Sequence, residues 1–242
     1  MTKRTPVRDC GETIAPGESA RPFARSVVSD ALSRASSVEL QPSLDAVGTP
    51  APSGHWIVVD LETTGLGAGA EITEIGAVRV RDGAVTDEFS SLVKPSRPIP
   101  PFITSLTGIT PAMVAGADPI AVVLGRFMDW SGLGCEGSPV LVAHNATFDV
   151  GFLRRGARAS SLPWPRVRVV DTLALARLAL PRPLVRNHKL GTIASYFGTA
   201  TVPEHRALGD ARATAEILLG FIDLLAGAGA TDVEDLIALT EQ

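Results

Sequence analysis

The stretch "WIVVDLETTGL", residues 56–66, joins the pattern of a buried strand to a pair of acids. Residues 57–59 are apolar and β-branched, which predicts a strand that enters a core. Asp60 and Glu62 follow on one face of that strand, because strand side chains alternate between faces. Two carboxylates on one face repel each other and resist removal from water. The stretch therefore predicts a site at which cations offset this repulsion.

The composition is that of an ordinary globular protein. The chain has 242 residues, of which 45% are hydrophobic, and a formal net charge of −4. This charge gives no general indication of nucleic-acid or membrane binding. Lys3 and Arg4 are not followed by the apolar segment of a signal peptide, and no run is long enough to span a bilayer. We therefore expect a cytoplasmic protein without membrane association.

The pattern of apolar residues divides the chain into an extension, a domain and a tail. Residues 1–53 are rich in Pro, Ser, Gly and Ala, which predicts a flexible extension with a short helix at 22–40. Residues 54–228 carry the periodic patterns of a globular domain. Residues 229–242 are interpreted as a short C-terminal helix and tail.

The order of the predicted elements indicates the fold class. Strands are expected at 55–61, 72–81 and 84–93, with Asp82-Gly83 as the turn of a hairpin and a Pro-rich loop at 94–110. Further strands are expected at 139–143 and 166–170, and helices at 118–131, 147–158, 171–180, 189–197, 208–226 and 232–239. This order predicts an α/β fold with a mixed five-stranded sheet, made of an antiparallel three-strand meander plus two parallel strands and flanked by helices.

Further acids stand at the ends of predicted core elements. Asp149 lies in the first turn of a helix that follows a buried strand, and Asp210 lies early in a long helix. Each alone is explained as an acid that interacts favourably with a helix N-terminus. Together with Asp60 and Glu62 they offer the hard oxygen ligands that suit Mg²⁺ or Mn²⁺. The metal hypothesis requires the fold to bring these ends together.

Three motifs in order resemble those of a known enzyme family. They are "VVDLETTGL", "HNATFDVGFL" and "HRALGDA", and they are similar to the exonuclease motifs of the DEDD superfamily. The His-x4-Asp form of the third motif is that of the DEDDh branch. The segments "TEIGAV", "SLTGIT", "VVDTLALAR" and "HKLGTIASYFG" also resemble this branch. The likeness is strongest to the proofreading epsilon subunit of bacterial DNA polymerase III and covers about residues 54–226.

The resemblance implies an RNase H-like fold and a metal-dependent 3′→5′ exonuclease that releases nucleoside monophosphates. Two divalent ions, Mg²⁺ or Mn²⁺, would activate water and neutralise charge on the phosphodiester. By likeness, Asp60 bridges both ions, Glu62 and Asp210 complete the tighter site, and Asp149 holds the second ion. The implied substrates are single-stranded or frayed 3′ ends of DNA.

The general base must be chosen among histidines, because His-x4-Asp occurs three times. His55 stands at an odd offset from Asp60 and therefore lies on the opposite strand face. His144 ends a buried strand and is interpreted as a half-buried residue with satisfied hydrogen bonds. His205 lies in a loop that can direct an imidazole towards the site, and the family motif also selects it. His188 is interpreted as a helix-start residue.

The substrate contacts are expected in two segments and one basic run. By likeness, the terminal nucleotide contacts Thr63, Thr64, Gly65, Leu66, Leu106, Thr107, Gly108 and Ile109. Asn145 and Phe148 are expected to orient the second motif, with Phe148 in the core rather than stacked on a base. Residues 154–189 contain nine Arg or Lys against one acid, which indicates either a phosphate-tracking surface or a solvated face.

Three functions remain open from the sequence. The first is a DNA 3′→5′ exonuclease in proofreading or repair, and the second is the same chemistry on RNA or short oligonucleotides. The third is a non-catalytic protein that binds a DNA polymerase or a sliding clamp. Residues 41–47, "QPSLDAV", have a weak similarity to a clamp-binding peptide and are otherwise a linker.

Overall fold

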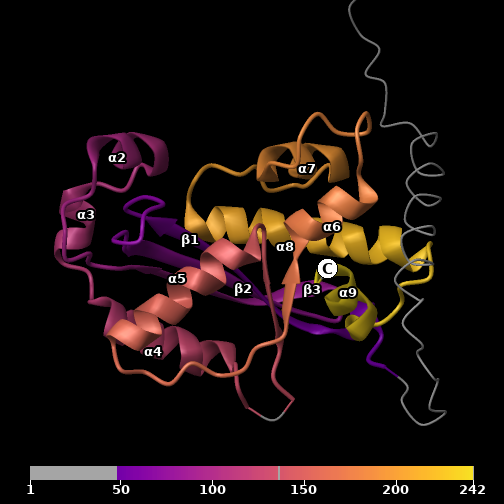
Figure 1. Cartoon of the computed structure of the whole chain (residues 1–242), viewed down its shortest axis with the longest axis horizontal. Coiled ribbons are helices and arrows are strands. Elements are labelled where there is room, and N and C mark those ends of the chain that lie inside the picture. The colour runs from indigo at the N-terminus through magenta and orange to yellow at the C-terminus, as the bar shows by residue number, and fades with distance from the viewer. Residues whose placement is uncertain (1–47, 136, 242) are drawn as a thin grey trace, which may run out of the picture.

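The computed structural model describes residues 48–135 and 137–241 and contains a five-stranded sheet with the order β3-β2-β1-β4-β5 (Figure 1). The first three strands form an antiparallel meander, and the last two run parallel to β1. The strands are β1 (His55–Thr63), β2 (Ile72–Arg81), β3 (Ala84–Leu92), β4 (Val140–Ala143) and β5 (Val169–Asp171). The predicted α/β fold with a mixed five-stranded sheet is confirmed.

The turn between β2 and β3 has the predicted chemistry. Asp82 and Gly83 both have positive φ, of 48° and 73°. Arg81 pairs with Ala84 across them. Two successive residues with positive φ form the tight turn that matches the twist of antiparallel strands. The Asp-Gly pair therefore fixes the register of the meander.

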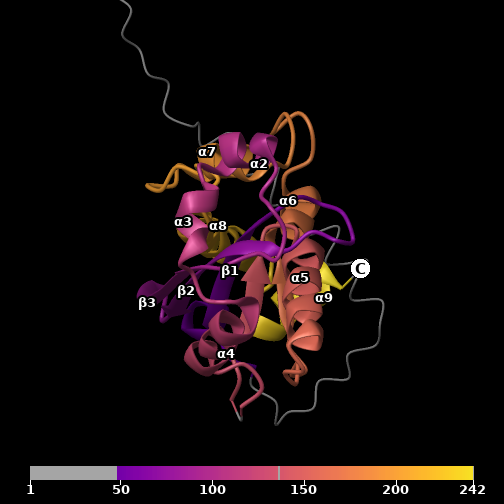
Figure 2. The same cartoon turned by 90° about the vertical axis from the view of Figure 1, so that its left-hand side faces the viewer.

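Helices cover both faces of the sheet (Figures 1 and 2). Ile57, Val59 and Leu61 of β1 pack in the cluster that contains residues of α4 (Ile120–Ser131) and α5 (Ala146–Ala159). Trp56 and Val58 point the other way, into the cluster built on α6, α7, α8 and α9. Asp60 and Glu62 continue the second set, because they stand at even offsets from Trp56. The helices on that face are α6 (Thr172–Ala179), α7 (Leu190–Phe197), α8 (Ala207–Ala226) and α9 (Val233–Thr240).

The structure corrects two predicted segments. The loop expected at 94–110 contains α2 (Pro101–Thr107), and α3 (Pro111–Ala115) follows it. Both helices begin with proline in the first turn, where its missing N–H costs nothing. The strand expected at 166–170 is reduced to β5, which begins only at Val169. The other predicted bounds differ by one or two residues.

Residues 49–53, expected in the extension, are attached to the domain. Ala51 is 1% exposed and donates its N–H to the carbonyl of Thr231 at 2.9 Å. The predicted C-terminal helix is α9, and it packs into the main core rather than forming a tail. The helix expected at 22–40 and the segment 41–47 lie outside the described residues. No helix in the described part of the chain is long and apolar enough to cross a bilayer.

The first turn of α8 packs directly on Gly76 of β2. A Cβ there would lie 2.1 Å from the backbone nitrogen of Leu208 and 2.2 Å from the carbonyl carbon of Ala207. Gly76→Ala should therefore push the first turn of α8 away and lower the free energy of unfolding by about 1–3 kcal/mol. Urea denaturation measures this change. Gly125→Ala is the matched control, because a Cβ at Gly125 in α4 meets nothing within 4 Å, and equal stability of both variants would contradict the prediction.

Candidate active site

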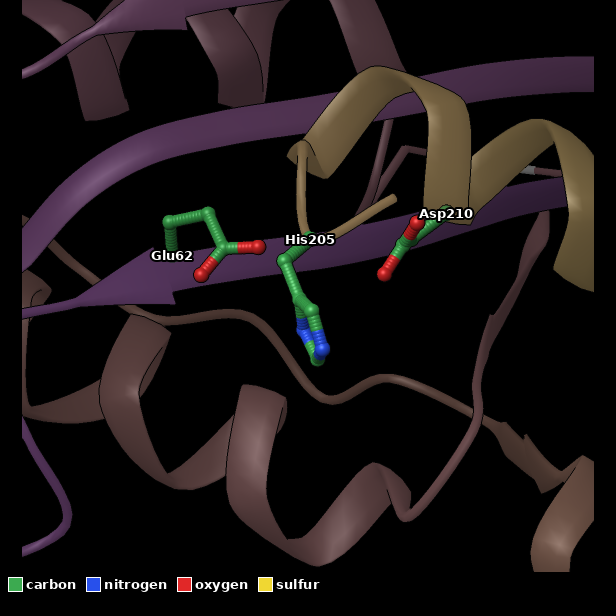
Figure 3. A group of neighbouring side chains, drawn as sticks. All are labelled: Glu62, His205 and Asp210. Atoms are coloured by element: carbon green, nitrogen blue, oxygen red, sulfur yellow. The ribbon is translucent and has the colours of Figure 1, made fainter. Parts of the chain in front are cut away.

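The carboxyl end of β1 meets the N-terminal turn of α8. Glu62 lies near the end of β1, Asp210 lies in the first turn of α8, and His205 stands in the loop before it. Ligand atoms of these three residues all lie within 4.8 Å of one another. Figure 3 shows the carboxylates of Glu62 and Asp210 directed into the same space, with the imidazole of His205 projecting from between them. The two segments, distant in sequence, thus form one cluster.

Asp60 and Asp149 complete this cluster. Burial raises the pKa of Asp60 well above its usual value, and the charges of Asp149, Asp210 and Glu62 raise it further. Asp149, in the first turn of α5, is 3% exposed. Burial raises the pKa of Asp149 as well, although hydrogen bonds from backbone groups, including that of Leu61, oppose the change. The four predicted acids therefore converge at one end of β1.

The electrostatics of the cluster fit a cation site. Burial raises the pKa of Glu62 to about 8, helped by the charges of Asp210 and Glu74. Burial also raises the pKa of Asp210, against a hydrogen bond at 2.9 Å from the N–H of Glu204. Buried carboxylates that repel one another are stabilised by a divalent cation, which prefers hard oxygen ligands. The residues present therefore fit Mg²⁺ or Mn²⁺.

Among the three histidines with the same spacing, only His205 joins the acids. It is exposed, and its φ of 56° places it in the left-handed region. His55 lies on the other side of β1, where its Nδ1 is 3.4 Å from a guanidinium nitrogen of Arg81. His144 is half-buried and bonds the hydroxyl of Thr172 at 3.0 Å. The interpretations of His55 and His144 are thereby confirmed.

His188 has a role in the fold. Its backbone carbonyl accepts a hydrogen bond from His144 Nε2 at 2.8 Å. Its own Nε2 bonds the carbonyl of Leu180 at 2.9 Å. Both contacts link the segment before α7 to the core, which is consistent with a helix-start residue.

Glu74 is a site residue that the sequence analysis did not assign. It is 2% exposed and is the partner of Glu62 in the β1–β2 register. Its carboxylate accepts hydrogen bonds from Arg206 at 2.7 and 3.1 Å and from the N–H of Ala207 at 3.1 Å. These bonds tie the start of α8 to β2 and set the position of Asp210 against Glu62. The sequence feature that could have identified Glu74 is an acid within an otherwise apolar strand, in "TEIGAV".

A pocket of about 190 Å³ opens beside the acids. Its lining includes most of the predicted nucleotide contacts, namely Thr63, Gly65, Leu66, Leu106, Thr107 and Phe148. Leu66 is 86% exposed, so the lining of the pocket includes a large apolar side chain that is open to solvent. Phe148 is half-buried, and its ring packs against the core cluster that contains Phe152 and also lines the pocket. Ile103 of α2 also lines it and was missed because that helix was not predicted.

The lining of this pocket does not include four other predicted residues: Thr64, Gly108, Ile109 and Asn145. Thr64 holds the loop, since its hydroxyl accepts the N–H of Glu71 at 2.9 Å. Ile109 is fully buried beneath α2 and α3, so its role is packing. Asn145 donates its N–H to Asp171 at 2.9 Å at the start of α5. That bond positions the helix that carries Asp149.

The metal-free protein should lose stability as the pH rises from about 4.5 to about 8, the interval over which burial shifts the pKa of Glu62. In this interval the folded state keeps a proton that the unfolded state releases, so the free energy of unfolding falls as the pH rises. In EDTA, Glu62→Gln should raise the Tm by several degrees near pH 8 and by much less near pH 4. For a domain of this size, a change of about 2–4 °C in Tm corresponds to 1 kcal/mol of unfolding free energy. Thermal denaturation at both pH values measures this, and a difference that does not depend on pH would contradict it.

Comparison with known proteins agrees with this geometry. The sequence pattern of the exonuclease family matches residues 57–218. A protein of Mycobacterium tuberculosis (strain CDC 1551 / Oshkosh), described as a bifunctional exonuclease/endonuclease, is 47% identical over 72% of this chain and 27% of its own length. The PolC-type DNA polymerase III of Listeria monocytogenes is 42% identical over 66% of this chain and 11% of the polymerase. The chain thus spans at most 27% of the length of these two relatives.

Solved structures share the fold. Exonuclease X in complex with 5′ overhanging duplex DNA superposes with a TM-score of 0.58 at 28% identity, over 76% of this chain and 99% of that chain. The nuclease domain of 3′hExo, a DEDDh family member bound to rAMP, has a TM-score of 0.60 at 23% identity, over 71% and 92%. With the family pattern matched over residues 57–218 and the motif acids gathered beside His205, this chain belongs to the exonuclease family.

Proposed function

We propose that this protein is a metal-dependent 3′→5′ exonuclease that removes nucleoside monophosphates from the 3′ ends of DNA. The observation that supports this most directly is the position of the acidic cluster. Three acids, Asp60, Glu62 and Asp210, line a pocket with apolar walls together with the exposed His205, and the charge of the buried Asp149 acts on Asp60. Such a pocket suits a terminal nucleoside, while the acids suit the cations that phosphodiester hydrolysis needs.

The roles of the residues follow from their places in the site. Asp60, Glu62, Asp149 and Asp210 would hold two divalent ions, Mg²⁺ or Mn²⁺. When bound, these ions supply an acidified water and neutralise charge on the phosphate and on the leaving 3′ oxygen. His205 takes the proton of the attacking water, since its ring is exposed beside the carboxylates.

The terminal nucleoside is held by the apolar walls of the pocket. Leu66 and Leu106 are 86% and 42% exposed, and Phe148 offers a ring from the start of α5. Aromatic and leucine side chains support a base without reading its hydrogen-bonding edge. This favours a sequence-tolerant exonuclease, as proofreading or repair requires. The relatives named as PolC-type DNA polymerases support such a setting, in which a DNA polymerase or a sliding clamp would be the partner.

The test is digestion of single-stranded DNA and RNA of equal length, labelled at either end, with Mg²⁺, Mn²⁺ or EDTA. We expect metal-dependent shortening from the 3′ end, with mononucleotide products and DNA degraded faster. Faster digestion of RNA would instead establish the RNA or oligonucleotide function. If the folded protein degrades neither and a mismatched primer terminus does not help, the proposed function fails.

A further inference from the structure

A second and larger cavity lies next to the catalytic pocket. Its volume is about 910 Å³, against about 190 Å³ for the catalytic pocket. It lies between the β1–β2 loop, the segment after β3, the start of α4 and the C-terminal half of α5. None of the acids in the catalytic cluster lines it.

The two cavities share one loop and one helix as a common wall. The β1–β2 loop contributes Gly65 and Leu66 to the catalytic pocket, while its next residues, 68–71, line the larger cavity. On α5, Phe148 lines the catalytic pocket and Phe152 lines the larger cavity, with 4.7 Å between their ring centroids. A polymer with its end in the catalytic pocket would have to pass over this wall to enter the larger cavity.

The walls of the larger cavity are strongly cationic. They carry Lys94, Arg97, Arg155 and Arg158, against one acid, Glu71. The carboxylate of Glu71 already accepts hydrogen bonds from the N–H and the hydroxyl of Ser96. Within residues 48–135 and 137–241, none of the four cations forms a salt bridge. Unpaired cations around a cavity attract a polyanion.

The floor of the larger cavity is apolar and aromatic. Phe152 is 3% exposed, and the guanidinium of Arg155 lies 4.0 Å from the centroid of its ring. Ile72, Val93 and Ile120 add aliphatic surface. A guanidinium supported on a ring is held in a fixed plane and can stack on a base with its other side. Cations with aromatic support are the usual elements of a single-strand binding groove.

We propose that this cavity binds the nucleotides of the substrate strand that lie 5′ to the one being removed. This inference rests on the proposed function, because it assigns the continuation of the strand whose end enters the catalytic pocket. Arg97, Arg155 and Arg158 contact its phosphates, and the Arg155–Phe152 pair supports a base. The cavity thereby makes binding depend on strand length, which the catalytic pocket alone does not.

The test combines binding with hydrolysis in the full chain. The triple variant carries Arg97→Ala, Arg155→Ala and Arg158→Ala. For the binding measurement it also carries Asp60→Asn, which prevents hydrolysis of the strand. The Kd for a labelled single strand is measured by fluorescence anisotropy. We expect Kd to rise at least about tenfold, and the slope of log Kd against log salt to fall by about 0.7 per lost phosphate contact. Hydrolysis of a dinucleotide by the triple variant without Asp60→Asn should fall much less than hydrolysis of the long strand, because a dinucleotide places only one nucleotide 5′ to the scissile bond.

The control and the other outcomes separate this inference from the proposed function. Arg81→Ala, at the far end of β2, removes an exposed arginine outside the cavity and should leave Kd unchanged. The cavity assignment is overturned if the Kd of the triple variant is unchanged, or if its hydrolysis rates for the dinucleotide and the long strand fall equally. In both cases, hydrolysis by the wild type would still support the proposed function. A rise in Kd that is seen only with duplex ends, and not with a single strand, also overturns the cavity assignment, because the cavity would then hold the uncleaved strand. Absence of hydrolysis by the wild type would instead reject the proposed function.

Discussion

Asp60→Asn is expected to abolish exonuclease activity, with a loss on the order of 10³-fold or more, while the protein stays folded. Stabilisation of transition-state charge by bound cations is worth several kcal/mol, and each 1.36 kcal/mol corresponds to about tenfold in rate. Asp60 stands at the centre of the cluster, because its pKa responds to the charges of Asp149, Asp210 and Glu62. Removing its charge should therefore weaken every cation that the cluster holds. The measurement is the single-turnover rate at saturating Mg²⁺.

Two further readouts distinguish a lost cation site from a damaged fold. In EDTA near neutral pH, the Tm of Asp60→Asn should exceed that of the wild type, because a buried and repelled carboxylate has been replaced by a neutral amide. Mn²⁺ affinity, measured by calorimetry, should fall with the activity. The chain has a second Asp-x-Glu pair, Asp232 and Glu234 at the start of α9. The matched control is Asp232→Asn, because asparagine caps a helix as well as aspartate does. A normal rate in Asp60→Asn, or a lower Tm in EDTA, would contradict this account.

The comparison of the two Asp-x-Glu pairs shows how far the sequence could be interpreted. Asp60 follows an apolar strand, and the structure buries it against the other motif acids. Asp232 stands in a charged stretch and forms the capping box of α9. The apolar context of Asp60 and the charged context of Asp232 therefore separate the site acid from the capping acid. Local signals, apolar alternation and Asp-Gly in a turn, predicted the antiparallel meander.

Contacts between distant segments could not be predicted in this way. The bond from Arg206 to Glu74 joins residues 132 positions apart, and no spacing rule brings them together. The larger cavity arises in the same way, because its cations come from the segment after β3 and from α5. Phe148 was expected in the core, and its ring packs against Phe152 there while it also lines the catalytic pocket. Such features depend on packing between elements, which a single sequence does not encode locally.

His205→Asn is the second variant with a large expected effect, a fall in kcat of about 10²- to 10⁴-fold, the contribution of general acid–base catalysis. Asparagine tolerates the left-handed backbone that His205 adopts at φ 56°. The substitution therefore removes the imidazole without adding backbone strain. His55→Asn, with the same spacing to an aspartate, should keep the wild-type rate.

The variant His205→Asn also distinguishes whether His205 acts as the general base or as a ligand of the cation. A ring nitrogen of His205 lies within 4.8 Å of oxygen atoms of Glu62 and Asp210, so a ligand role and a base role predict different kinetics. A base acts on the attacking water, so its loss lowers kcat while the Mn²⁺ dissociation constant stays the same. A ligand holds the cation, so its loss raises that constant, and excess Mn²⁺ restores the rate. We expect the first result, because His205 is exposed whereas Glu62 and Asp210 are buried, and a mobile imidazole suits proton transfer better than rigid coordination.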